Sequence, residues 1–101
     1  MMPAKYIDLE GNKVEYDLDS VIDVVNGWSR LKDGWQGYII YLPDSHRFVE
    51  LMSSIPDFRG DSASISVEVT SEYVKKTYGL TTDQLSRIQS DPISWNFIQK
   101  R

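Results

Sequence analysis

The sequence predicts one α+β domain with a largely antiparallel sheet and helices packed on it. Residues 38–42 are an unbroken apolar and aromatic run, which is typical of a strand covered on both faces. Residues 63–69 alternate between polar and apolar side chains, as a half-buried strand does. Residues 71–89 carry two short helical patterns that Gly79 separates. Strands and helices in separate blocks of the chain are typical of the α+β class.

The first third of the chain predicts a hairpin and then a helix. Residues 6–10 and 13–18 are the two strands, and the Gly11-Asn12 pair supplies a two-residue turn. The alternation predicts an inward face and a charged face in water, which places both strands at or near a sheet edge. The predicted inward residues are Ile7, Leu9, Val14, Tyr16 and Leu18, and the outward ones are Lys13, Glu15 and Asp17. A helix is predicted from Ser20, its cap, to Gly34, although Gly27 within it costs about 1 kcal/mol relative to Ala. The apolar residues that recur there at helical spacing are Val21, Val24, Val25, Trp28 and Leu31.

The middle of the chain predicts three strands. After the strand at 38–42, residues 43–46 form a turn, because Pro43 is followed by polar residues that bond their own backbone. Residues 47–52 then return antiparallel to residues 38–42. A loop covers residues 53–62. In the strand at 63–69 we expect Ile65, Val67 and Val69 to point inward and Glu68 to point outward.

The last third predicts two helices and an end strand. The helices cover residues 71–78, ended by Gly79, and residues 82–89, capped by Thr81 or Thr82. We expect a strand at residues 93–98, where apolar and polar residues alternate, but Asp91 as a cap with Pro92 in the first turn would equally start a helix. The expected order of elements is therefore β-β-α-β-β-β-α-α-β.

Composition bounds the class of protein. The chain has 101 residues, enough for one modest core, and a formal net charge of -4, which disfavours general binding to nucleic acid or anionic membranes. It has no cysteine, so disulfides and thiolate chemistry are excluded. No stretch approaches the ~20 apolar residues of a membrane span, and the N-terminus has no apolar run like that of a signal peptide. We therefore expect a cytoplasmic protein that binds neither nucleic acid nor membrane.

No motif in the sequence carries a recognisable chemistry. Asp44, Ser45 and His46 are the residue types of a hydrolase triad, but three consecutive residues in a turn cannot converge as a triad requires. One histidine and no cysteine argue against a zinc site, and the glycine-rich phosphate-binding pattern is absent. Carboxylate pairs that form only in space stay open. We therefore expect no catalytic residue, metal or cofactor, and no enzyme activity.

A surplus of large aromatic residues indicates a binding surface. The chain has three Trp and six Tyr, which are residue types favoured at protein interfaces. We expect Trp28 and Trp95 in the core, and Trp35, which lies between two glycines, at the surface. The predicted partner-binding residues, on loops expected at one end of the sheet, are Trp35, Asp44, His46, Arg47, Asp57, Phe58, Arg59 and Asp61.

The order of a helix, a hairpin, a strand, a helix and the final Pro92-Ile93-Ser94-Trp95 resembles that of bacterial immunity proteins, which tend to end in a Pro-x-x-Trp stretch after a helix. The resemblance spans residues 19–97 as a pattern, and the long acidic or glycine-rich middle of that family is short here. It implies a cytoplasmic protein that binds and inhibits a cognate bacterial toxin. It brings no catalytic residue.

The favoured hypothesis is thus a small acidic protein-binding module, in its specific form an immunity protein whose acidic rim steers a basic toxin domain. One alternative is a small hydrolase or ligand-binding domain with a carboxylate-lined pocket between sheet and helix. Another is a phage or structural subunit whose strands pair with further copies. The sequence leaves the oligomeric state open.

Overall fold

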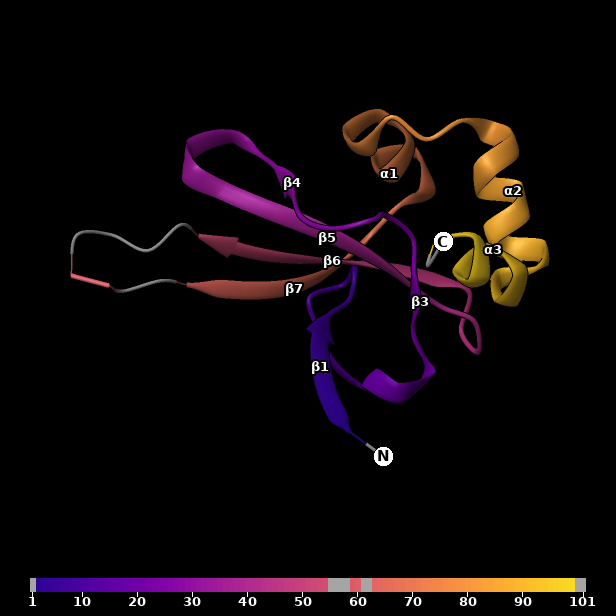
Figure 1. Ribbon diagram of the computed structural model, residues 1–101. Helices are drawn as coiled ribbons and strands as arrows, with labels where there is room; N and C mark the ends of the chain where they lie inside the picture. The colour runs from indigo at the N-terminus through magenta and orange to yellow at the C-terminus, as the bar shows by residue number, and fades with distance from the viewer. Residues whose placement is uncertain (1, 55–58, 61–62, 100–101) are drawn as a thin grey trace.

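The described part of the chain folds as an α+β unit with a curled, mixed sheet and three α-helices (Figure 1). The computed structural model describes residues 2–54, 59–60 and 63–99. The strands lie in the order β2-β1-β7-β6-β5-β3, and β4 also pairs with β5. Their bounds are β1 Pro3–Ile7, β2 Lys13–Asp17, β3 Ile22–Asp23, β4 Ser29–Arg30, β5 Trp35–Leu42, β6 Arg47–Ser54 and β7 Ser64–Val69. The helices are α1 Ser71–Tyr78, α2 Thr82–Ser90 and α3 Pro92–Gln99.

The α+β class is confirmed. The prediction of a largely antiparallel sheet is wrong, because the sheet is mixed. β5, β6 and β7 form an antiparallel meander, and β1 pairs antiparallel with β2. β1 then joins the meander through a parallel contact with β7, where Ile7 lies opposite Val67. Side-chain alternation along a strand fixes the buried face but does not fix the direction of the neighbouring strand.

The predicted helix at residues 20–34 is wrong. A 3₁₀ turn at Leu18–Ser20, β3, β4 and a second 3₁₀ turn at Lys32–Gly34 occupy this segment. β3 pairs with β5, and the Val24 amide continues that pairing by donating to the Ile39 carbonyl at 3.0 Å. The segment is rich in β-branched residues, which fit a strand better than a helix, and Gly27 has a φ of 99° that no helix contains. Without a helix here, Trp28 is 51% exposed rather than in the core.

The N-terminal hairpin lies at the sheet edge, as predicted, but its turn and inward face differ. Asp8 organises the connection between the strands, because its Oδ1 accepts from the amides of Glu10 and Asn12 at 3.0 and 2.8 Å. Ile7 pairs with Lys13, so the connection covers residues 8–12 and Gly-Asn is not a two-residue turn. Tyr6 is buried and Leu9 is exposed, because Tyr6 pairs with Val14 and shares its face.

The run at residues 38–42 is covered on both faces over most of its length, as predicted. Ile39 and Tyr41 belong to a core cluster under the helices, together with Phe48 of β6. Ile40 and Leu42 belong to a second cluster, which the N-terminal hairpin covers with Tyr6. β5 therefore separates two core clusters, one under the helices and one under the N-terminal hairpin.

The inward face predicted for β7 is correct only near its C-terminal end. Val69 packs on the core under the helices, but Ile65 is 43% exposed and Glu68, predicted to face outward, is buried. The reason is visible in Figure 1, where the far ends of β5, β6 and β7 extend beyond the three helices. Glu68 lies on the opposite face, under the N-terminal hairpin.

After β7, the described part of the chain consists of three helices and their short connections. α1 ends at Gly79 with a φ of 72°, and Thr81 and Gln84 form a capping box that begins α2, so both helix predictions are confirmed. The strand expected at residues 93–98 is wrong, because the Asp91-Pro92 alternative holds and α3 occupies this segment. The expected element order is therefore wrong at residues 20–34 and 93–98. Trp95 is buried, as predicted, and its Nε1 donates to the Val24 carbonyl at 3.3 Å.

Candidate binding cleft

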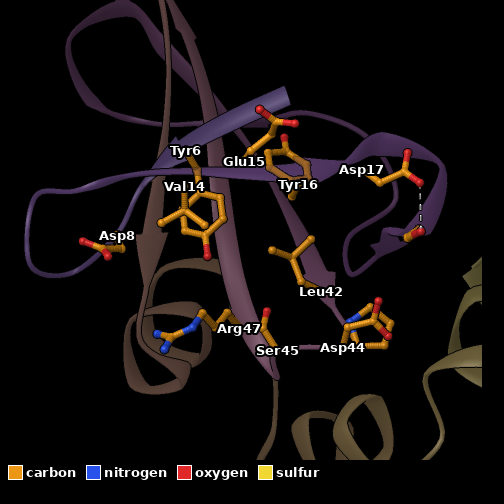
Figure 2. A pocket seen from close by; sticks show the side chains of 12 residues that line it. Tyr6, Asp8, Val14, Glu15, Tyr16, Asp17, Leu42, Asp44, Ser45 and Arg47 are labelled. Carbon is orange, nitrogen blue, oxygen red and sulfur yellow. Dashed lines mark hydrogen bonds between the residues drawn. The ribbon is translucent and has the colours of Figure 1, made fainter. Parts of the chain in front are cut away.

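A cleft of about 380 Å³ lies between the N-terminal hairpin and the turn that joins β5 to β6 (Figure 2). We call it the acidic cleft. The hairpin contributes its inward face, and the Pro43–Ser45 turn closes the opposite side. The lining residues are Tyr6, Asp8, Val14, Glu15, Tyr16, Asp17, Ser20, Leu42, Pro43, Asp44, Ser45 and Arg47.

Two tyrosines form the aromatic part of the acidic cleft. Tyr6 and Tyr16 come from neighbouring strands, and their ring centroids lie 5.6 Å apart with the planes tilted by 56°. Burial raises the pKa of both hydroxyls, and for Tyr6 the nearby Glu68 carboxylate raises it further. Both phenols are therefore neutral at physiological pH. Tyr6 is only 3% exposed, so the ring surface that the cleft offers to a ligand comes mainly from Tyr16, which packs against Tyr6.

Four carboxylates surround this aromatic surface. Backbone hydrogen bonds lower the pKa of Asp8, chiefly from the Asn12 amide, and lower the pKa of Asp17, chiefly from the Asp19 amide. Glu15 and Asp44 complete the set. Within the described residues, none of the four forms a salt bridge with a Lys or Arg side chain, so their negative charge is free to act on a ligand.

The carboxylates surround the cleft and do not converge on one point. Asp8 lies on the opposite side of the cleft from Asp17 and Asp44, and Glu15 lies above the tyrosines (Figure 2). In the part of the chain that the structure describes, no group of three or more His, Cys, Asp or Glu is placed to hold a metal ion. Asp8 and Asp17 also have lowered pKa values, which suits an anion and not a general acid.

The one cation that lines the acidic cleft is held by a buried acid. Arg47 Nη1 donates to Glu68 Oε2 at 2.6 Å, and the other oxygen, Oε1, accepts from the Leu9 amide at 3.2 Å. The guanidinium therefore offsets the charge of Glu68 more than that of the cleft. This clamp also joins the hairpin, β6 and β7, so it helps to fix the shape of the cleft.

Those predicted partner-binding residues that the structure describes do not gather at one end of the sheet. Asp44 and Arg47 line the acidic cleft, and His46 follows in the same turn with a φ of 58°, its Nδ1 lying 3.0 Å from the Tyr41 hydroxyl. Trp35 pairs with Ser54 at the other end of the β5–β6 ladder. Arg59 is exposed, whereas Asp57, Phe58 and Asp61 lie outside the described residues.

Sequence reasoning missed the hairpin's share of the cleft, namely Tyr6, Asp8, Glu15, Tyr16 and Asp17. A signal was present, because acids and tyrosines intermix on the two predicted strands. Treating the hairpin as an edge with a wet charged face assigned these acids to solvent. The curl of the sheet instead brings them to the β5–β6 turn.

A buried carboxylate with two tyrosine partners lies under α1 and is closed off from solvent. Glu50 is 2% exposed, and its Oε2 accepts from the hydroxyls of Tyr78 at 2.6 Å and Tyr73 at 2.9 Å. Burial first, and then Glu50, raises the pKa of both phenols, so they remain donors. A buried carboxylate with two donors is satisfied, and Glu50 does not line a described cavity.

Comparisons with family models, with curated proteins and with solved structures gave no match to this chain. The function is therefore inferred from the geometry of the acidic cleft. The immunity-protein pattern also begins with a helix at residues 19–34 that the structure replaces with short strands and turns. Among the described residues, no helix has the length and apolar character needed to cross a membrane.

Proposed function

We propose that this protein is a binding module for a basic protein, and that the acidic cleft receives a cationic side chain of that partner. The observation that carries the proposal is the partly exposed Tyr16 ring, backed by the buried Tyr6, together with four carboxylates that make no salt bridge in the described chain. An Arg or Lys side chain buries its carbon stem on aromatic surface and keeps its charge near acids.

The size of the cleft agrees with this occupant. A volume of about 380 Å³ lies near the lower end of the 300–1,000 Å³ that ligand pockets span, which suits one or two side chains. The net charge of -4 adds a long-range attraction for a basic partner, which speeds association at low salt. The module supplies no catalytic group in this proposal.

Inhibition of a bacterial toxin is the specific form of this proposal. A module of this kind blocks a basic toxin when it covers the surface that the toxin uses on its own substrate. This form is supported by the acidic cleft, together with the C-terminal Pro-x-x-Trp stretch after a helix. A carboxylate-based hydrolase has less support, because Asp8 and Asp17 have lowered pKa values and Glu50 is closed off.

The proposal is tested by titrating the labelled protein with an acetyl-Gly-Arg-Gly amide peptide and with its citrulline analogue, while recording amide NMR spectra. We expect saturable shifts at Tyr6, Tyr16 and Asp44 with the arginine peptide and weaker ones with citrulline. Replacing both Glu15→Gln and Asp44→Asn should weaken binding about two- to thirtyfold, because each of the two exposed ion pairs contributes about 0.2–1 kcal/mol.

The matched control removes the same number of charges elsewhere. Asp33 and Glu72 are exposed and lie outside the acidic cleft, so Asp33→Asn with Glu72→Gln should leave the affinity for the arginine peptide nearly unchanged. Equal weakening by both double variants would mean that net charge alone attracts the peptide. Shifts that avoid the cleft residues would refute the proposed site.

A further inference from the structure

A larger groove lies on the other face of the sheet and differs from the acidic cleft in charge and lining. It has a volume of about 870 Å³ and lies where the far ends of β5, β6 and β7 extend past the helices. Its apolar and aromatic lining comes from Leu31, Trp35, Met52, Ile65 and Tyr73. We call it the arm groove. Its volume falls within the 300–1,000 Å³ of small-ligand pockets, which are mostly apolar with a few polar groups.

The floor of the arm groove follows from the strand register. Gly37, Met52 and Ile65 lie opposite one another across β5, β6 and β7, so they share the helix-facing side of the sheet. Gly37 has no side chain, which lets Leu31 pack down onto β5 beside it. Ile65 remains 43% exposed, so the apolar floor is open to a ligand.

One wall of the arm groove is the ring of Tyr73, which a buried hydrogen bond to Glu50 holds in place. Tyr73 lines the groove, while its hydroxyl donates to Glu50 Oε2 at 2.9 Å and lies 3.0 Å from Oε1. The phenol tip is therefore used inside the protein, and the groove receives mainly the carbon surface of the ring. Glu50 itself is buried and is not part of the lining.

Charge decides which apolar ligand fits. Arg30 and Lys32 are exposed residues that line the arm groove, and they form no ion pair within the described part of the chain. Among the lining residues that the structure describes, none is Asp or Glu. In a protein with a net charge of -4, two unpaired cations beside an apolar floor are a local reversal of sign.

We propose that the arm groove binds an apolar carboxylate, such as a medium- or long-chain fatty acid. The carboxylate faces Lys32, with the charge of Arg30 beside it at the rim, and the hydrocarbon chain covers Trp35, Met52 and Ile65. This site is independent of the acidic cleft, which lies under the opposite face of the sheet and takes a cation.

The test is an NMR titration with decanoate below its micelle concentration, with 1-decanol as the neutral probe. The indole N–H resonance of Trp35, identified by its loss in Trp35→Phe, should shift saturably with decanoate. The indole of Trp95 should not move, because it is buried and donates to Val24. Arg30→Gln with Lys32→Gln should weaken decanoate binding about three- to tenfold and leave 1-decanol binding unchanged.

The control pair is Lys5→Gln with Lys13→Gln, which removes two exposed cations from the N-terminal hairpin and should leave decanoate binding unchanged. Three results would each overturn the proposal. They are a Trp35 resonance that does not saturate, equal loss of affinity in both double variants, and shifts spread over the whole protein. An arm groove that takes an acidic segment of a partner protein instead would give the first of these results.

Discussion

Gly37 offers a one-methyl test of how β5 packs under α1. A Cβ at this position would overlap the Tyr78 hydroxyl and would lie 2.8 Å from Leu31 Cδ1. Tyr78 cannot simply move aside, because its hydroxyl donates to the buried Glu50 at 2.6 Å. Gly37→Ala therefore strains the packing against Leu31 and also displaces the Tyr78 hydroxyl, which leaves the Glu50 carboxylate with Tyr73 as its remaining phenol donor.

The magnitude follows from these two costs. Overpacking a full core typically costs about 1–3 kcal/mol, and losing a hydrogen bond to a charged group costs about 1.5–3 kcal/mol. Replacing Gly by Ala in a strand returns roughly 0.5–1 kcal/mol through the entropy of the unfolded chain. We therefore expect Gly37→Ala to lower the free energy of unfolding by about 2–5 kcal/mol, a large share of the roughly 5–15 kcal/mol of a typical domain.

The assay is urea unfolding followed by circular dichroism, in a double-mutant cycle with Tyr78→Phe. Removing the Tyr78 hydroxyl removes the main overlap, so Gly37→Ala should cost at least about 1 kcal/mol less in Tyr78→Phe than in the native background. Tyr73→Phe is the matched control, because Tyr73 also bonds Glu50 but is not among the nearest neighbours of a Cβ at Gly37. An equal cost in all three backgrounds would refute the reasoning.

Three further predictions concern the clamp, a helix cap and alkaline pH. Arg47→Met should lower the free energy of unfolding, because Glu68 would stay buried with only the Leu9 amide to bond; adding Glu68→Gln should recover part of the loss in the same urea assay. Thr81→Ala should lower the free energy of unfolding by about 1 kcal/mol, because it removes the hydroxyl that accepts a hydrogen bond from the Gln84 amide. This loss is measured as a shift of the urea midpoint. Burial and Asp23 raise the pKa of Tyr38 from 10.0 to about 12, so the folded protein holds this proton longer than the unfolded chain does. Stability should then be unaffected by Tyr38 below pH 10, fall as the pH rises from 10 towards 12, and fall less steeply in Tyr38→Phe.

The elements that could be predicted are those whose signals are local. The run at residues 38–42 has apolar residues on both sides of its pleat, so any sheet that contains it must cover both faces. α1 and α2 are bounded by local sequence signals. Gly79, in the left-handed region, ends α1, and the reciprocal Thr81–Gln84 capping box begins α2. These signals need no knowledge of the rest of the chain.

The helix prediction for residues 20–34 failed because a strand period and a helix period both fit the apolar residues of this segment. Ile22 and Val24 alternate into the core as strand residues, while a wider selection of apolar positions matches a helix. β3 and β4 are two residues long each, and their pairing with β5 is what defines them. A strand defined by its partner carries little pattern of its own, and the helical match was a coincidence of spacing.

The acidic cleft could not be predicted because its two sides come from separate parts of the chain. The hairpin meets the β5–β6 turn only because β1 attaches to β7. That attachment is a short parallel contact, and the alternation of either strand does not indicate it. Asp44 and Arg47 were predicted because they lie in or beside a loop expected at one end of the sheet, whereas the alternation of the hairpin strands placed Asp8 and Asp17 in solvent.

Two buried acids explain how short contacts can hold these elements in place. Among the described residues, the buried polar or charged side chains are Glu50 and Glu68, and they lie on opposite faces of the meander. Glu50 joins β6 to α1 through Tyr73 and Tyr78, and Glu68 joins β7 to the hairpin through Leu9 and to β6 through Arg47. Buried charges of this kind add little net stability, because desolvation offsets the attraction, but a wrong arrangement would leave each carboxylate without its donors. Glu68 can therefore fix the hairpin where the β1–β7 pairing alone is short, and Glu50 can fix the wall of the arm groove. On this argument, the shapes of both proposed binding sites depend on acids that neither ligand touches.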